Sequence, residues 1–328
     1  MDINRVKHIL AVRNDRFGEF LLNIPAFRAL KETFVNARLT VVVHPYVGEL
    51  AGCVPYIDEV VEWNGQSRSL REKAALIGIL RRKKIDIALM LNPSKEFNIY
   101  TFMAGIPQRI GYSRKWPFML TGTISDEKHL AKRHEVEYNL QLVSLVGAMT
   151  KDSSLFLSVP DVPPAVMAGE YGIPEKSRII VVHPFTSDPV KQWPFERFAK
   201  LAEVLVQDLP VTVAFIGGKE EAARSRKCFG RVFGKRIVDL TGKTGLCELA
   251  GFLKQCDLLV SGDSGPVHLA CCVKTPVIAL FRSDLPGKIA HRWGPWGPGN
   301  TVIEKNSLRK ITVNEVVQKV KESWSYRV

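Results

Sequence analysis

Residues 258–270 read Leu-Leu-Val-Ser-Gly-Asp-Ser-Gly-Pro-Val-His-Leu-Ala and carry the clearest structural signal in the chain. The apolar run that ends at Ser261 is typical of a buried strand, and Pro266 marks the first turn of a helix. Asp263 or Ser264 can cap that helix after the tight turn between the two. A strand that leads through a turn into a helix is the repeating unit of an α/β protein with a parallel sheet.

The same turn is suited to binding an anion. The first N–H groups of a helix have no partner inside the helix, and the positive end of its dipole favours phosphate. An ordinary capped helix explains the same residues, so the motif alone does not establish a site. The carboxylate of Asp263 would repel a diphosphate, so we expect it to hold the turn while the neighbouring amides donate.

Strands and helices alternate outward from this motif along the whole chain. In the first half we predict strands at His8–Val12, Arg38–His44, Glu59–Trp63, Ile85–Leu91 and Arg109–Tyr112, and helices at Phe20–Phe34, Ser69–Arg82, Lys95–Met103 and His134–Met149. In the second half we predict strands at Ile179–His183, Val211–Ile216, Ile237–Leu240, Leu258–Ser261 and Val277–Phe281, and helices at Pro194–Gln207, Glu220–Phe229, Leu246–Gln255 and Pro266–Cys272.

The chain is expected to form two domains. Its 328 residues exceed what one hydrophobic core usually holds, and residues 158–174 are rich in proline and glycine, which is typical of a linker. We therefore predict an N-terminal domain over 1–165 and a C-terminal domain over 166–328, whose last helix can pack back on the first domain. Each is expected to be a Rossmann-like, doubly wound parallel sheet, and the two to face a central cleft where ligands bind.

Two other strand ends in the second half carry polar residues that suit a nucleotide. After the strand that ends at His183, a polar loop presents Thr186, Ser187 and Lys191. Hydroxyls and an ammonium there can neutralise a departing anion, although an ordinary solvated loop has the same composition. The next strand runs into Gly217-Gly-Lys-Glu220, where Glu220 can bond ribose hydroxyls or simply stabilise a helix start.

A fourth segment lies at the end of the first strand of the chain. Gly18 makes a turn there, and Glu19 stands at the mouth of the following helix. A carboxylate in this place can act as a general base, or it can only complement the positive end of the helix. The spacing alone does not distinguish the two interpretations.

Three of these segments together resemble a known family. Residues 13–31 (Arg-Asn-Asp-Arg-Phe-Gly-Glu-Phe-Leu-Leu-Asn-Ile-Pro-Ala-Phe-Arg-Ala-Leu-Lys) are similar to the opening motif of the family 9 glycosyltransferases, the lipopolysaccharide heptosyltransferases. Residues 191–202 (Lys-Gln-Trp-Pro-Phe-Glu-Arg-Phe-Ala-Lys-Leu-Ala) and 262–270 resemble its two C-terminal signatures, in the same order. The resemblance implies a GT-B fold, ADP-heptose as donor, a sugar hydroxyl of the lipopolysaccharide core as acceptor, and metal-independent transfer with inversion.

The resemblance also implies roles for individual residues. Glu19 would be the base on the acceptor hydroxyl, in a position where the family usually has aspartate, and Asp15-Arg16 replaces a pair that is commonly small and hydroxylated. Lys191 would lie beside the donor phosphates. Glu19, Lys191 and Asp263 are the expected catalytic residues. We expect no metal ligand and no cofactor besides the donor substrate. The residues expected to bind the donor are Thr186, Ser187, Lys191, Glu220, Ser264, Gly265, Pro266, Val267 and His268.

Two alternative functions stay open at this point. A different GT-B nucleotide-sugar enzyme, such as an epimerase, would share the fold but need other acid and base residues, and a family member could use another donor or acceptor. A nucleic-acid-binding protein would explain the excess of 46 Lys and Arg over 33 Asp and Glu, a net charge of +13. The longest basic run, residues 81–84, is too short to favour nucleic acid, so we expect an anionic glycolipid at a membrane surface instead.

Composition also leads to an expected location. No apolar run approaches the roughly 20 residues that span a bilayer, and the N-terminus lacks the apolar core of a signal peptide. The six cysteines show no Cys-x-x-Cys spacing and no nearby cluster of metal ligands. We therefore expect reduced thiols and a cytoplasmic enzyme that associates peripherally with the inner face of the cytoplasmic membrane.

Overall fold

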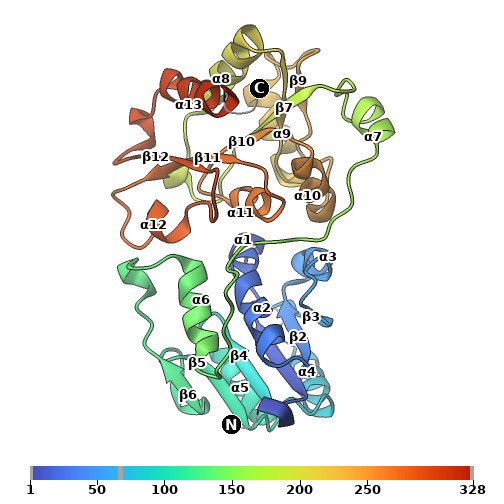
Figure 1. The fold of residues 1–328 in the computed structure, drawn as a ribbon, viewed down its shortest axis with the longest axis vertical. Coiled ribbons are helices and arrows are strands. Elements are labelled where there is room, and N and C mark those ends of the chain that lie inside the picture. Colours follow the sequence, from blue (N-terminus) through green and yellow to red (C-terminus); the bar gives the residue numbers. More distant parts are fainter. Residues whose placement is uncertain (1–2, 66–68, 326–328) are drawn as a thin grey trace. The chain divides into compact units, whose positions relative to one another are not determined.

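The computed structural model describes residues 3–65 and 69–325, which divide into two compact units, 1–158 and 159–328 (Figure 1). The division falls a few residues before the predicted domain boundary at 165. The end of helix α10 (Leu246–Lys254) explains the difference. The Nζ of Lys254 donates to the carbonyl oxygen of Val159, and the side-chain amide of Gln255, the next residue, donates to that of Val162. These bonds attach residues 159–162 to the second unit.

The first unit contains one six-stranded parallel sheet in the order β3-β2-β1-β4-β5-β6. Its strands are β1 His8–Val12, β2 Arg38–Val43, β3 Glu59–Glu62, β4 Ile87–Met90, β5 Gln108–Tyr112 and β6 Gly122–Ile124. Its helices are α1 Phe17–Leu21, α2 Ile24–Thr33, α3 Gly48–Gly52, α4 Leu70–Arg82, α5 Lys95–Met103 and α6 Glu135–Ser144. Helices α2 and α6 pack together, and α4 packs with α5 over the core formed by Leu10, Val12, Ala88 and Met90.

The second unit repeats this plan with its own six-stranded parallel sheet, in the order β12-β11-β10-β7-β8-β9. Its strands are β7 Arg178–His183, β8 Val211–Phe215, β9 Ile237–Asp239, β10 Leu258–Gly262, β11 Val277–Arg282 and β12 Thr301–Lys305. Its helices are α7 Pro164–Gly169, α8 Phe195–Asp208, α9 Ala222–Phe229, α10 Leu246–Lys254, α11 Gly265–Cys272, α12 Ala290–Trp293 and α13 Val313–Ser325. The predicted α/β class with two doubly wound parallel sheets is confirmed.

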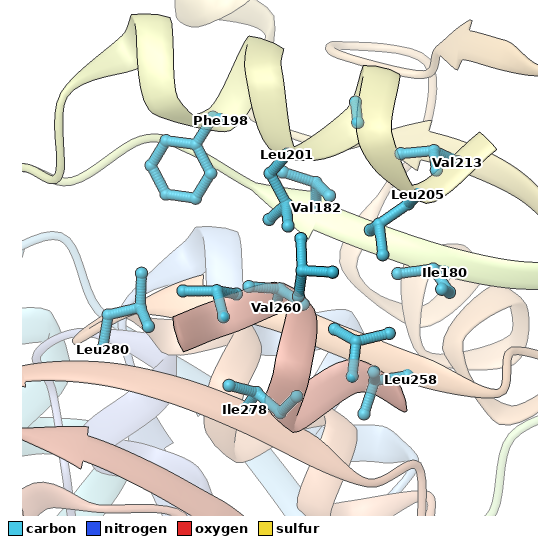
Figure 2. Packing of buried hydrophobic residues seen from close by; sticks show 14 of the residues in the cluster. Ile180, Val182, Phe198, Leu201, Leu205, Val213, Leu258, Val260, Ile278 and Leu280 are labelled. Carbon is cyan, nitrogen blue, oxygen red and sulfur yellow. The ribbon is translucent and has the colours of Figure 1, made fainter. Parts of the chain in front are cut away.

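Helix α8 shows how the sequence pattern builds the core of the second unit. Phe198, Leu201 and Leu205 recur at helical spacing and are fully buried, and they point from α8 toward the strands (Figure 2). There they meet alternate residues of the sheet, among them Val182 and Val260. Burial of each such side chain contributes about 1.5 to 3 kcal/mol. Helix α13 packs against α8 and β11, within the same unit.

Two predicted elements differ from the structure for local reasons. The single helix predicted over Phe20–Phe34 is two helices, α1 and α2, because Pro25 lacks an N–H group and begins a new helix. The side chain of Asn23 donates to the carbonyl oxygen of Glu19, at 2.7 Å, at the break. In the predicted linker, α7 begins at Pro164, so the prolines there start a helix and do not only interrupt one.

Over residues 3–65 and 69–325, none of the helices combines the length and the apolar character needed to cross a bilayer.

Candidate active site

The sheet of the second unit reverses its strand order between β7 and β10. From β7 the chain continues to β8 on one side, whereas β10 lies on the other side and leads to β11. Loops at such a switch point leave the sheet in opposite directions and form a crevice at the carboxyl ends of the strands. The loop after β7 carries Lys191, and the turn after β10 carries Asp263 and Ser264.

Lys191 and Asp263 form an ion pair at this crevice, with side chains 17% and 12% exposed. Burial raises the pKa of Asp263, and the ammonium of Lys191 opposes that rise. The carboxylate therefore directly orients the ammonium of Lys191. An ammonium has three N–H donors, so Lys191 can keep this partner and still donate to a phosphate.

A buried tryptophan holds the Lys191 loop in place. Trp193 is 1% exposed, and its indole N–H donates to the carbonyl oxygen of Ile311 at 3.0 Å. The indole also packs edge-on against Phe198 of α8. Lys191 itself ends a short 3-10 turn, Pro189–Lys191, that Asp188 caps through the N–H of Val190. The backbone next to Lys191 is thus fixed from both sides.

Thr186 and Ser187 lie on the same loop, in different surroundings. The hydroxyl of Thr186 accepts the N–H of Asp188 at 3.2 Å, so it shapes the loop. Ser187 is exposed, and its hydroxyl is accessible to a ligand. Asp188 pairs with Lys288 at 3.2 Å, and this ammonium lowers the pKa of the Asp188 carboxyl. Lys288 is therefore a second cation near the loop, and the sequence did not reveal it.

A cluster of His183, Ser261 and Ser264 lies beneath the turn. The Nδ1 of His183 is 3.1 Å from the Oγ atoms of both serines, which are themselves 2.8 Å apart. Burial lowers the pKa of His183 to about 4, so the imidazole is neutral at pH 7. His183 and Ser261 are aligned partners on β7 and β10. Strand order was therefore the signal that could have joined these two residues.

The expected capping of α11 by Asp263 or Ser264 is absent from the structure. Ser264 is the N-cap residue with extended backbone, but its hydroxyl points into the cluster and makes no cap bond. Pro266 has no N–H to donate, and the N–H of Val267 is bonded to the carbonyl oxygen of Ser264. Side chains of Val267 and His268 are buried. Among the residues expected to bind the donor here, Gly265 is thus the best placed to offer a backbone N–H.

Glu220 lies at the carboxyl end of the next strand, β8. It is exposed, on the short 3-10 turn Lys219–Glu221. The acid that stabilises the turn is Glu221, whose carboxylate accepts the N–H of Gly218 at 2.8 Å and whose pKa is raised by burial. Glu221 therefore stabilises the helix start, which was the alternative role expected for Glu220. The Glu220 carboxylate is accessible to a ligand.

The buried imidazole of His183 should make the stability of the second unit depend on pH. Its folded-state pKa of about 4 lies below the ordinary 6.5, so the unfolded chain binds the proton first as the pH falls. Stability should therefore be complete above pH 6.5 and decrease toward pH 4, by on the order of 3 kcal/mol. Urea unfolding across this range should show a flatter profile for His183→Gln. The same change at the exposed His129 should leave the slope unchanged, and an equally steep profile for His183→Gln would contradict the assignment.

The first unit has a corresponding switch point between β1 and β4, and Glu19 lies in the α1 turn that follows β1. Its carboxyl group is half-buried, and burial and the nearby carboxylate of Asp15 raise its pKa. Arg13 opposes this rise. A carboxylate with a raised pKa is a stronger base and suits proton abstraction near neutral pH.

Asp15, by contrast, is held by two neighbours. Its Oδ1 pairs with the Nε of Arg13 at 2.9 Å, and its Oδ2 accepts the side-chain amide of Asn92 at 3.3 Å. Arg13 is buried and also reaches Glu135, at 3.5 Å, which in turn pairs with Lys128. Because both of its oxygens already accept hydrogen bonds from these neighbours, Asp15 is a weaker candidate for the base than Glu19.

Tyr46 fixes the loop that separates Asp15 from Glu19. Its hydroxyl accepts the N–H of Phe17 at 2.9 Å and donates to the carbonyl oxygen of Asp15 at 3.3 Å. Burial raises the pKa of this phenol to about 12, so it remains a donor at pH 7. The sequence did not reveal Tyr46, Asn92 and Glu135 as neighbours of this loop, because each is far from Glu19 along the chain.

The family model described as glycosyltransferase family 9 (heptosyltransferase) matches residues 74–321, three quarters of the chain. The chain belongs to glycosyltransferase family 9. It is therefore an enzyme that transfers a glycosyl group, and the resemblance seen in the sequence motifs is confirmed.

Individual relatives of this family 9 glycosyltransferase agree with the assignment. Lipopolysaccharide heptosyltransferase 2 of Escherichia coli is 22% identical over 297 residues, which cover 85% of this chain and 83% of the relative. The structure of a family 9 glycosyltransferase from Veillonella parvula has a TM-score of 0.86 at 21% identity and covers 99% of both chains. The E. coli heptosyltransferase WaaC with ADP has a TM-score of 0.77 at 19% identity, covering 96% of this chain and 99% of that one. The fold is therefore of the GT-B class.

Proposed function

We propose that this family 9 glycosyltransferase moves a heptose from ADP-heptose to a sugar hydroxyl of the lipopolysaccharide core. The relative named lipopolysaccharide heptosyltransferase 2 supports the acceptor class, and the similar fold of WaaC with ADP supports the nucleotide. The observation that carries the proposal is the ion pair of Lys191 and Asp263 at the switch point of β7 and β10. It presents a cation where a nucleotide diphosphate would bind in such a fold.

In the proposed reaction, the Glu19 carboxylate takes the proton of the acceptor hydroxyl. The oxygen attacks the anomeric carbon from the face opposite to the diphosphate, the bond to the diphosphate breaks, and the configuration inverts. Lys191 and the first turn of α11 stabilise the negative charge that develops on the departing ADP. We propose that no metal ion takes part.

The proposed acceptor also indicates where in the cell the enzyme would work. Lipopolysaccharide core sugars are carried on an anionic glycolipid, so the enzyme would work at the cytoplasmic face of the inner membrane. The net charge of +13 fits an anionic surface. A nucleic acid is not required as a partner.

The donor can be identified directly. The purified enzyme is incubated with a deacylated core acceptor and, in parallel, with ADP-heptose, ADP-glucose, UDP-glucose and GDP-mannose, and the products are analysed by mass spectrometry. We expect a heptose addition only with ADP-heptose. Transfer from another nucleotide sugar would refute the donor assignment, and an epimerised nucleotide sugar without transfer would favour the epimerase alternative.

Nucleotide preference is expected even without an acceptor. Calorimetric titration should show that ADP binds more tightly than UDP, GDP or AMP. The diphosphate of ADP would bind Lys191, and adenine is the nucleobase of the proposed donor, ADP-heptose. AMP lacks the second phosphate and therefore tests the cation specifically. Equal affinities for ADP and AMP would remove the diphosphate role of Lys191, and equal affinities for ADP and UDP would remove the adenine preference.

A further inference from the structure

The first unit presents aromatic and apolar side chains to solvent along helix α5. Trp116 and Phe118 are 41% and 72% exposed, and Phe102 and Met103 are each 51% exposed. The rings of Trp116 and Phe118 stack on each other, with centroids 5.6 Å apart and planes inclined by 29°. Large exposed apolar side chains that gather in one place usually mark an interaction site.

Cations alternate with these rings. The Nζ of Lys95 lies 3.7 Å from the centroid of the Trp116 ring. The guanidinium of Arg109 lies 5.3 Å from the centroid of Phe102, and its Nε donates to the carbonyl oxygen of Met119, next to Phe118. These contacts link one continuous surface, which we call the α5 surface: Lys95, Phe102, Met103, Arg109, Trp116 and Phe118.

Cations outnumber carboxylates in this region. Residues 95–121 include four cations and a single carboxylate, Glu96, and one of the cations, Arg114, pairs with Asp126 at 3.0 Å. At the end of α5, Arg81 donates to the carbonyl oxygen of Met103 at 2.6 Å, which places the start of the basic run 81–84 beside the same surface. From the basic run that the nucleotide site does not use, Arg81 therefore lies next to the exposed apolar residues, whereas Lys83 pairs with Glu59.

The backbone holds the two aromatic rings outward. Lys115 and Trp116 have φ of 55° and 67°, a left-handed conformation that costs free energy in residues other than glycine. The side-chain amide of Asn98, itself buried, stabilises this turn by donating to the carbonyl oxygens of Lys115 and Trp116, at 2.9 and 3.5 Å. The Nζ of Lys115 donates to the carbonyl oxygen of Pro93. The fold thus maintains an unfavourable turn that leaves two large rings exposed.

We infer that the α5 surface docks on an anionic phospholipid bilayer, with Trp116 and Phe118 in the headgroup region and the surrounding cations on lipid phosphates. Amphipathic aromatic rings favour the membrane interface, and cations add attraction to an anionic leaflet. The inference rests on the proposed function in that a lipid-borne acceptor gives the enzyme a reason to bind a membrane. It assigns that binding to one surface of the first unit.

The test measures vesicle binding without nucleotide or acceptor. Sedimentation with vesicles of phosphatidylglycerol and phosphatidylethanolamine compares the parent with a Trp116→Asn, Phe118→Ser double variant, in which asparagine tolerates the left-handed turn. We expect the partition coefficient to fall by roughly tenfold or more. Binding of the parent should also decrease with salt and be weak on phosphatidylcholine.

A matched control uses exposed apolar residues of the same unit at a different place. Val35 and Met149 are 70% and 74% exposed and follow α2 and α6, which pack together, whereas α5 packs with α4. A Val35→Ser, Met149→Ser double variant should bind vesicles like the parent. Equal loss in both double variants, or no loss in the Trp116 and Phe118 variant, would overturn the inference.

Two further readouts separate the outcomes. Brominated lipids should quench the part of the parent's tryptophan fluorescence that comes from Trp116. This quenching should be missing in the Trp116→Asn variant. Transfer to a deacylated, soluble acceptor should be unchanged in the double variant. If the protein binds vesicles but transfers no sugar, the membrane-binding role of the α5 surface stands and the proposed function is refuted. If it transfers sugar but binds DNA instead of vesicles, the proposed function stands and the membrane-binding role is refuted.

Discussion

Replacing Glu19 by glutamine is expected to lower the rate of sugar transfer by about 10² to 10⁴ while ADP binds as before. A sugar hydroxyl is a poor nucleophile at neutral pH, and glutamine keeps the size of the side chain but cannot accept the proton. Because burial and Asp15 raise the pKa of Glu19, the rate of the parent should rise with pH as this group loses its proton. Stopped assays with a soluble acceptor across a pH series would measure both effects.

The controls for Glu19 come from the same unit. Glu49→Gln changes an exposed glutamate of α3 and should transfer at the parental rate. Glu19→Asp should retain partial activity, since its side chain is one methylene shorter and places the carboxylate farther from the acceptor hydroxyl. A parental rate in Glu19→Gln would place the base elsewhere, and Asp15→Asn would then be tested, although Arg13 and Asn92 already occupy that carboxylate.

Replacing Lys191 by alanine should weaken ADP binding by about 10- to 100-fold and lower the transfer rate by about 10² to 10³. The ammonium donates to the diphosphate in the bound state and more strongly to the departing group. Calorimetry with ADP and single-turnover transfer measure the two losses separately. Lys200→Ala, which removes an exposed lysine of α8, should change neither.

The Lys191→Ala variant also removes the ion-pair partner of Asp263, so a double variant is needed to separate stability from ADP binding. Without Lys191, the buried carboxyl of Asp263 loses the cation that stabilises its charged form, so Lys191→Ala should also unfold at lower temperature. In the Lys191→Ala, Asp263→Asn double variant the stability should recover, but the ADP affinity should not. If affinity recovered together with stability, Lys191 would have only a structural role.

The inner strands of both sheets could be predicted almost residue by residue. Strands such as β1 and β10 are buried on both faces, so their sequences are continuous apolar runs bounded by polar residues. The edge strands β6 and β12 escaped notice for the opposite reason. Thr301–Lys305 has one buried residue and ends in Glu-Lys, so its pattern does not differ from that of a loop.

The candidate site could be predicted only in part. Residues at strand ends, such as Lys191 and Asp263, stand out because the fold class says where ligands bind. Their ion pair depends on the conformations of two loops that are 72 positions apart in the chain, which no local pattern encodes. Tyr46 and His183 were missed because their roles arise from neighbours on other strands and helices.

Each sheet is complete within its own unit. The strands β1–β6 all precede Ser158, the strands β7–β12 all follow it, and both sheets have the same order of first, second and third strands on one side and the remaining three on the other. A gene for such a chain can recombine at one crossover point near codon 158 without separating any pair of hydrogen-bonded strands. The two halves can thus be inherited from different ancestors, and chimaeric chains joined there would keep both sheets intact.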